Sequence, residues 1–252
     1  MRPGGGAGGS PATWQQVGGE SYDSWQKRYG QLESDEVFGV ASVGGYSEYA
    51  LLDRPFAKPQ ELSFETAAAM VTVGEAAYRA IEHLGVQPGQ TLLIRGAGGR
   101  VGAVAVQLAV ARGLTVVGTV AESDTARVSG LGAAAVRYGE GWVERVGRAA
   151  PGGVDFVFDA SGAGALADSV ALVGDPGKVI TIAVPSLAEH GVRFTGMDPA
   201  HRFPEALPQL ADLIAAGKLD VPVWRAYPLG DAAKAHADLE AHRNHGKAVL
   251  LP

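Results

Sequence analysis

The sequence predicts an α/β protein built on a doubly wound parallel sheet. Two observations lead to this fold class. From Thr91 onward, short apolar runs alternate with longer segments of helical periodicity, as in βαβ units. The first of these runs, "TLLIRG", is apolar throughout its centre and is followed directly by a glycine cluster and a helical segment. Strands that alternate with helices at this spacing lie parallel in one sheet.

Before the sheet, the chain changes character twice. Residues 1–36 are rich in glycine, proline and serine at their start, which predicts an irregular N-terminal segment. "VFGVASVGGYSEYALLD" predicts two short strands joined by a glycine turn. A helix follows, with Ser63 as its N-cap, Glu65 in the first turn, and Gly85 and Pro88 at its end.

The alternating region then runs to the C-terminus. Further strands are expected at "LTVVGTV", "AAVRY", "VDFVFDAS" and "GKVITIAV". Helices are expected between and after these strands. The first covers residues 99–112, and the second follows "LTVVGTV" and ends near residue 130. The others are expected at "GWVERVGRAA", "GALADSVALV" and "FPEALPQLADLIAAGKL". The tail reads as a strand, "VPVWRAYPL", a helix, and a last strand, "KAVLLP".

Composition excludes several function classes. The 252 residues carry a net charge of −6 and no basic stripe, which argues against nucleic-acid binding. The chain contains no cysteine, so disulfides, thiolate nucleophiles and cysteine-bound zinc are excluded, and no metal site is expected. No apolar run is long enough for a bilayer, and no signal peptide is visible; a cytoplasmic protein without membrane contact is therefore expected.

The glycine cluster carries the main functional prediction. Gly96, Gly99 and Gly102 are spaced by three, and Gly98 lies between them. A helix N-terminus presents unpaired N–H groups and a partial positive charge, and glycines let a pyrophosphate approach the backbone. A strand leads in and a helix leads out, so dinucleotide binding is favoured over a turn without a ligand. Arg100 and Val101 belong to the same predicted site.

The end of the second strand bears on the choice of cofactor. Glu122 follows Gly102 by 20 residues, where an acid holds a ribose 2′-hydroxyl and favours NAD(H). Against this, Ser123, Arg127 and Tyr138 together offer a cradle for the additional phosphate of NADP(H). NADP(H) is slightly favoured, and NAD(H) stays open.

Two further loops are expected at the same edge of the sheet. "DASG" follows one strand and supplies Ala160, Ser161 and Gly162; "IAVPS" follows the next and supplies Ala183 and Val184. Loops at the carboxyl ends of parallel strands surround the ligand crevice, so these residues are expected near the nicotinamide and its ribose. No side chain stands out as a proton donor, and no catalytic residue is assigned.

Several stretches together resemble the zinc-independent medium-chain dehydrogenase/reductase superfamily, in its quinone oxidoreductase and enoyl-reductase branch. They include "GGYSEYALLD", "LSFETAAAMVTVGEAAYRAI", "GVQPGQTLLIRGAGGRVGAVAVQLAVARG", "VDFVFDASG" and "GKLDVPVWRAYPLGDAAKAHADLEAHRNHGKAVLLP". The resemblance covers residues 37–252. It implies a Rossmann domain (76–219) set within a GroES-like catalytic domain, of which residues 37–75 and 220–252 are the remainder, and it implies a homodimer.

The resemblance also marks departures. The part of the GroES-like domain that precedes "GGYSEY" is much shorter than in the family. Ala76 stands where the family tends to have a threonine near the nicotinamide, and Ala121 and Asp124 replace its phosphate-binding serine and lysine. Tyr138 matches the family's tyrosine near the adenosine phosphate.

The expected function is NAD(P)H-dependent reduction of a small-molecule quinone or an activated C=C bond by hydride transfer. Two alternatives stay open from the residues themselves. One is a dinucleotide-binding protein without redox activity, acting as a regulator or partner subunit. The other is a non-redox enzyme, such as a cyclase, that uses the altered cleft.

Overall fold

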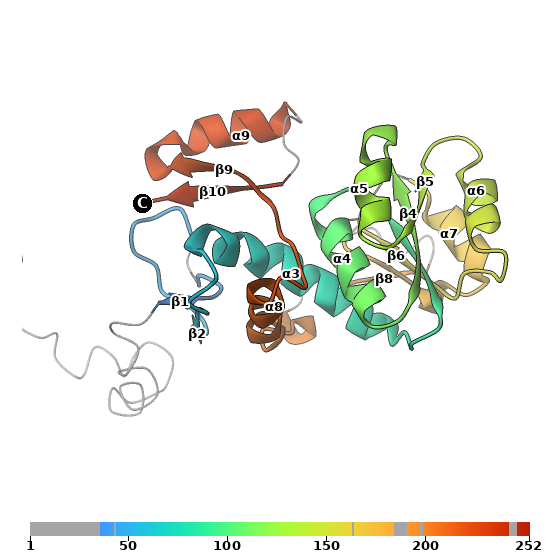
Figure 1. The fold of residues 1–252 in the computed structure, drawn as a ribbon, viewed down its shortest axis with the longest axis horizontal. Helices are drawn as coiled ribbons and strands as arrows, with labels where there is room; N and C mark the ends of the chain where they lie inside the picture. Colours follow the sequence, from blue (N-terminus) through green and yellow to red (C-terminus); the bar gives the residue numbers. More distant parts are fainter. Residues whose placement is uncertain (1–35, 43, 163, 184–190, 197–198, 242–245) are drawn as a thin grey trace, which may run out of the picture. The chain divides into compact units, whose positions relative to one another are not determined.

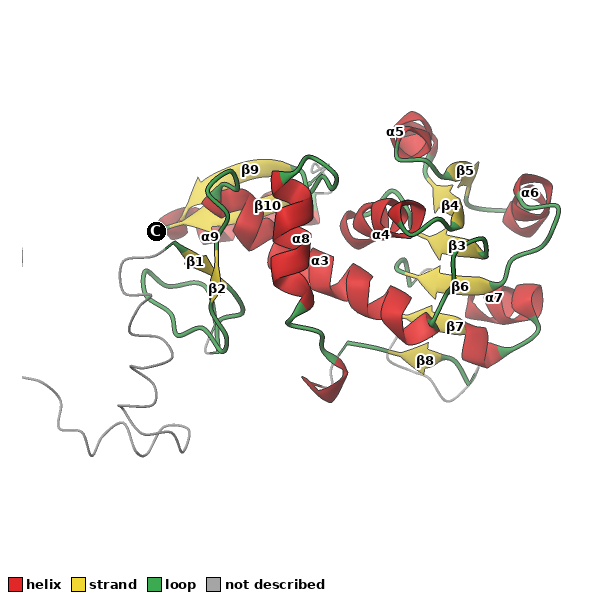
Figure 2. Ribbon diagram, turned by 60° about the horizontal axis from the view of Figure 1, so that its bottom comes forward, coloured by secondary structure: helices red, strands yellow, loops and turns green. Residues whose placement is uncertain are grey.

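Within the described residues, six strands form a wholly parallel sheet. The computed structural model describes residues 36–252 except 43, 163, 184–190, 197–198 and 242–245. The strand order is β5-β4-β3-β6-β7-β8. The strands are β3 (Thr91–Arg95), β4 (Thr115–Val120), β5 (Ala134–Arg137), β6 (Phe156–Asp159), β7 (Val179–Thr181) and β8 (Arg193–Phe194). The chain builds outward from β3 and then returns to its other side, so a switch point lies between β3 and β6 (Figure 2).

Helices cover both faces of this sheet, as a doubly wound fold requires. Leu92 and Ile94 of β3 belong to the core shared with α3, α4 and α8, whereas Leu93 between them belongs to the core under α6 and α7. Because both faces of β3 are buried, its sequence is an unbroken apolar run. The helices concerned are α3 (Phe64–Leu84), α4 (Arg100–Ala111), α5 (Thr125–Gly130), α6 (Trp142–Ala149), α7 (Leu166–Val173) and α8 (Ala206–Ala215).

Helix α3 begins and ends where the sequence predicts. Ser63 is its N-cap and accepts a hydrogen bond from the backbone N–H of Thr66, while Gly85 ends it in a left-handed conformation with φ of 66°. The helix contacts α4, α8 and the β9–β10 pair (Figure 1). The predicted domain boundary at Ala76 lies inside this helix, and the residues from Phe38 to Pro252 form one compact unit.

Two small strand pairs accompany the parallel sheet. β1 (Val37–Phe38) pairs with β2 (Phe56–Ala57), and an antiparallel bridge joins Ala41 to Leu52. β9 (Val223–Pro228) and β10 (Lys247–Leu251) lie parallel and are joined through α9 (Ala232–Glu240). The part of the chain that is described also contains four short 3-10 turns: Glu122–Asp124, Pro176–Lys178, Pro199–His201 and Leu229–Asp231.

The predicted strands and helices from Ser63 to the C-terminus are confirmed. Of the two strands predicted in residues 37–53, the first forms as β1, whereas the second prediction is wrong, because residues 45–49 form bends and Leu52 takes part only in an isolated bridge. Within the described residues, the sequence also missed two short strands. β2 and β8 each contain two residues, which is too short for any periodicity to show. The glycine-rich segment of residues 1–36 lies outside the described residues except for Glu36. In the part of the chain that is described, none of the helices is both long and apolar enough to span a membrane.

Candidate functional site: a dinucleotide cleft

The turn from β3 into α4 is built by glycines in distinct roles. Gly96 has a φ of 74°, which a residue with a side chain adopts at a cost. Its N–H donates to the Thr119 hydroxyl at 3.1 Å, and the Ala97 N–H donates to the Thr119 carbonyl at 2.9 Å, so β4 holds the turn. Gly99 is the N-cap of α4 and has no side chain to cap it. The first N–H groups of α4 are therefore available to an anion.

Gly102 allows the helix to approach the turn closely. A Cβ atom at this position would lie 2.1 Å from the carbonyl oxygen of Gly96 and 2.8 Å from the Cα of Ala97. Both neighbours are backbone atoms, which cannot move aside cheaply. The spacing of three glycines therefore reflects steric requirements of the fold as well as access for a ligand.

A buried polar cluster lies at the strand ends next to the glycine turn. Asp159, at the end of β6, is fully buried and accepts hydrogen bonds from Arg95 at 3.2 Å, the Ser161 hydroxyl at 2.8 Å and the Thr181 hydroxyl at 2.9 Å. Burial lowers the pKa of Arg95 from its ordinary value, while the carboxylates of Asp159 and Asp168 oppose that shift. The cluster ties the ends of β3, β6 and β7 together, which positions the crevice.

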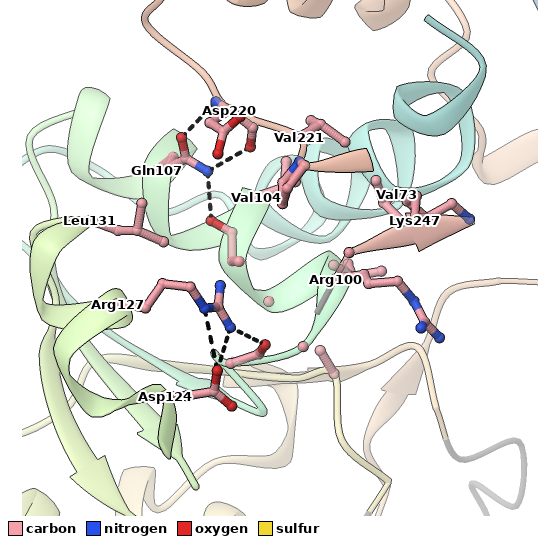
Figure 3. Close-up of a pocket in the computed structure, with 18 residues that line it drawn as sticks. Val73, Arg100, Val104, Gln107, Asp124, Arg127, Leu131, Asp220, Val221 and Lys247 are labelled. Atoms are coloured by element: carbon pink, nitrogen blue, oxygen red, sulfur yellow. Dashed lines mark hydrogen bonds and ion pairs between the residues drawn. The ribbon is translucent and has the colours of Figure 1, made fainter. Parts of the chain in front are cut away.

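Two pockets open on either side of the glycine turn. The β4-side pocket, of about 490 Å³, lies between the turn, the end of β4 and the loop after β5; the β10-side pocket, of about 520 Å³, lies between α4 and the start of β10 (Figure 3). Gly98, Gly99 and Asp124 line both pockets. The two pockets therefore meet at the turn, where a pyrophosphate is expected.

Two ion pairs lie near the end of β4; Asp124 lines both pockets, and Arg127 lines the β10-side pocket. Asp124 holds the guanidinium of Arg127 at 2.7 Å, and Arg127 also donates to the Gly98 carbonyl (Figure 3). Glu122 pairs with Arg137 at 2.8 Å, with both side chains about two-thirds exposed. Tyr138, which is 64% exposed, lies at the rim, where its ring is available to stack on an adenine.

The β10-side pocket carries two cations. Arg100, the first residue of α4, and Lys247, the first residue of β10, lie near each other and project to the same side in Figure 3. Neither side chain forms an ion pair or a side-chain hydrogen bond within the described residues. Burial lowers the pKa of Lys247 from its ordinary value, and the charge of Arg100 lowers it further. Two neighbouring cations beside a helix N-terminus favour an anionic ligand.

The structure brings most of the predicted residues to these pockets. Those that line one or both are Gly96, Gly98, Gly99, Arg100, Val101, Gly102, Arg127, Tyr138, Ala160 and Ser161. Glu122, Ser123, Gly162 and Ala183 do not line either pocket, and Val184 lies outside the described residues. The side chain of Glu122 pairs with Arg137 and does not line either pocket. The acid that lines both pockets is Asp124, two residues further along the chain.

Sequence reasoning did not assign three residues to the site. In the sequence, Asp124 stands out only as a departure from the family, whereas in the structure its carboxylate lies against the turn. Trp142 lines the β4-side pocket and stacks on Arg95, with the guanidinium 5.3 Å from the ring centre. Lys247 is 145 positions from Gly102 in the chain, so no local motif could have indicated it. Within the described residues, no group of three or more His, Asp or Glu side chains is placed to hold a metal ion.

Known proteins resemble this chain over most of its length. A family model described as "Zinc-binding dehydrogenase" matches residues 131–250. The quinone oxidoreductase of Sus scrofa is 30% identical, and the match covers 92% of this chain and 75% of that protein. A solved quinone oxidoreductase from Pseudomonas syringae is 30% identical with a TM-score of 0.73, covering 86% of this chain and 75% of the other.

A third relative adds a ligand to the comparison. The Escherichia coli quinone oxidoreductase, solved in complex with NADPH, superposes with a TM-score of 0.73 at 27% identity; the match covers 86% of this chain and 75% of that one. The parallel sheet, the glycine turn and these similarities agree with one another. The chain belongs to the quinone oxidoreductase family of medium-chain dehydrogenases/reductases.

Proposed function

We propose that the protein is an NAD(P)H-dependent oxidoreductase that reduces a quinone or the activated C=C bond of an enone or enoyl substrate. The observation that carries the proposal is the glycine turn at the N-terminus of α4, open on both sides into pockets of a size suited to a dinucleotide. Family membership supports the same reading. The bound cofactor would supply the hydride, and the protein would supply binding and orientation.

The chain's own residues have distinct tasks in this proposal. The N–H groups at the start of α4 bind the pyrophosphate, with Arg100 and Lys247 adding positive charge from the β10 side. Tyr138 stacks on the adenine in the β4-side pocket. Ala160 and Ser161, after β6, border the path toward the nicotinamide. The proton that completes the reduction is not assigned to a residue.

Two measurements test the proposal in sequence. A fluorescence titration of the purified protein with NADPH and NADH should show saturable binding of at least one. Turnover should then be followed by loss of nicotinamide absorbance with a panel of quinones, enones and enoyl thioesters. Binding without turnover of any acceptor would contradict an oxidoreductase, and absence of binding would contradict a cofactor site at the glycine turn.

We further propose that the protein works as a homodimer in the cytoplasm. Within the described residues, β8 ends the parallel sheet and has a neighbour on one side only, so its outer edge is open to a second copy. Light scattering coupled to size-exclusion chromatography should give twice the chain mass of 25.9 kDa. A monomer at micromolar concentration would contradict the dimer, and cell fractionation tests the location.

A further inference from the structure

Another pocket lies apart from the glycine turn. It has a volume of about 620 Å³ and lies between α3, the start of α8 and the segment that contains β1 and β2; we call it the α3–α8 pocket. Helix α3 contributes one face, through Ala68, Val71, Thr72 and Glu75, which follow the helical spacing of three and four. None of the residues that line it lines either pocket at the glycine turn. The proposed dinucleotide site therefore does not account for this pocket.

The acid that α3 contributes to this pocket is already balanced by a buried arginine. Glu75 and Arg79 are each 4% exposed, and Arg79 Nε donates to Glu75 Oε1 at 2.9 Å. The same oxygen accepts a hydrogen bond from the N–H of Phe203 at 3.1 Å. The other oxygen, Oε2, is buried and accepts no hydrogen bond from the described residues. The negative charge of Glu75 is therefore compensated inside the protein and is not offered to a ligand.

Two further guanidinium groups line the pocket. The Arg202 side chain is 43% exposed, and its Nη1 lies 3.8 Å from Glu75 Oε2, which is within ion-pair range but too long for a hydrogen bond. Its Nη2 donates to the Gly196 carbonyl at 3.2 Å, which leaves other N–H groups of this guanidinium for a ligand. Arg54, next to β2, is exposed and forms no ion pair within the described residues. Both arginines can therefore turn N–H groups to a bound molecule.

The charges at the pocket leave an excess of one positive charge. The lining contains the cations Arg54 and Arg202 and the anions Asp53 and Glu75, and Arg79 adds a third cation through its bond to Glu75. One carboxylate cannot neutralise both Arg79 and Arg202. Guanidinium groups are always charged and match a carboxylate with two parallel N–H donors. A carboxylate group is therefore the favoured polar part of a ligand.

Most of the remaining lining is apolar. Phe56 comes from β2, Val71 from α3, and Pro204 and Leu207 from the start of α8. The guanidinium of Arg54 lies over the ring of Phe56, 5.1 Å from its centre, so a cation borders the apolar surface directly. Pockets of roughly 300–1,000 Å³ with apolar walls and a few polar groups are typical of small-molecule sites. The pocket therefore suits a molecule with an apolar body and one charged end.

We infer that the α3–α8 pocket binds an organic acid with an apolar body, such as an aromatic acid, in its carboxylate form. The carboxylate pairs with Arg54 and Arg202, and the apolar body packs against Phe56 and the apolar side chains of α3 and α8. The inference goes beyond the proposed function, because it concerns other residues and requires no dinucleotide.

The first test compares two probes of the same shape and different charge. 2-Naphthoate carries the carboxylate, and 2-naphthamide replaces it by a neutral amide. Equilibrium dialysis of the full chain, at low salt and without dinucleotide, gives the two dissociation constants. We expect 2-naphthoate to bind at least tenfold more tightly, because only the carboxylate forms charge-assisted bonds to both arginines. Equal affinities, or no binding of 2-naphthoate, overturn the inference.

The second test removes the cations one at a time. Arg54→Gln and Arg202→Gln should each weaken 2-naphthoate binding at least fivefold and leave 2-naphthamide within twofold of the wild type. Arg148→Gln is the matched control, since it makes the same charge change at an exposed position of α6 outside the pocket. Its affinity for 2-naphthoate should stay within twofold. An equal loss in the control, or no loss in a folded Arg54→Gln variant, overturns the inference.

The third test blocks the pocket. Ala68→Phe introduces a ring from an exposed position of α3 and should weaken 2-naphthoate binding at least tenfold, whereas Ala237→Phe, at an exposed position of α9, should not. Titration of the wild type with NADPH and NADH tests the proposed function separately. Dinucleotide binding without 2-naphthoate binding overturns this inference alone, and the reverse overturns the proposed function alone. Because the wild-type preference between the probes is itself decisive, poor folding of a variant does not remove the test.

Discussion

The carboxyl end of the parallel sheet and the segment between β1 and β2 are both rich in turns and glycine, yet they are built in opposite ways. At the sheet, Asp159 is fully buried with three partner residues, and a Cβ atom at Gly102 would meet backbone atoms. In the segment, Gly44 and Gly45 have open space around them, and Tyr49 is 90% exposed. The cofactor turn is therefore preorganised by packing, whereas the tip of the other segment, around Gly44 and Tyr49, packs against little. Tolerance to substitution should differ accordingly.

The largest effect is expected at Gly102. Gly102→Val would place side-chain atoms inside the van der Waals radius of the Gly96 carbonyl, so α4 must move away from the turn. Dinucleotide binding should be lost, with a large drop in melting temperature. Gly130→Ala is the control, since a Cβ there meets nothing within 4 Å. Dinucleotide affinity retained in Gly102→Val would contradict the steric role assigned to this glycine.

The next largest effect is expected at Asp159. Asp159→Ala leaves the buried guanidinium of Arg95 without its partner, and breaking a buried pair typically costs about 3–5 kcal/mol of unfolding free energy. Denaturant unfolding measures this loss directly. The exposed Asp212→Ala serves as the comparison and should change stability by less than about 0.5 kcal/mol. Equal effects of the two substitutions would show that the cluster under the turn does not hold the sheet ends together.

A smaller effect is expected at the start of α3, the helix that contacts both α4 and the β9–β10 pair. Ser63→Ala removes the oxygen that accepts from the Thr66 N–H at 3.1 Å, which should cost about 1 kcal/mol. Ser63→Asp keeps a capping oxygen and should restore most of that stability. Thermal unfolding of the three proteins separates capping from other effects of the side chain. A Ser63→Asp variant as unstable as Ser63→Ala would rule out the cap.

The smallest effect is expected in the open segment. The Tyr46 hydroxyl lies 2.9 Å from Nε2 of His236 on α9, and the tyrosine side chain is exposed. Because water replaces such a bond readily, Tyr46→Phe should change the unfolding free energy by less than about 0.5 kcal/mol. His236→Gln should behave alike. A loss of more than about 2 kcal/mol of unfolding free energy in either variant would show that the open segment also depends on its side-chain contacts.

Local patterns accounted for most of the secondary structure. Ser63 and Gly85 mark the ends of α3 because N-cap and C-cap preferences act over one helical turn. The apolar runs of β3, β4 and β6 identify buried strands because both their faces are covered. Strands of two residues, such as β8, carry no periodicity and appear only when the sheet forms beside them.

The candidate site likewise combines features set by local sequence with features set by tertiary contacts. The sequence by itself determined the glycine turn, because Gly96, Gly99 and Gly102 belong to one strand–turn–helix unit whose steric requirements are local. Only the tertiary structure decided that Lys247 approaches the start of α4, and that Asp124 rather than Glu122 meets the turn. The physical reason is that both outcomes depend on side-chain partners from other elements: the pairing of Glu122 with Arg137 on β5, and the place of β10 beside α4.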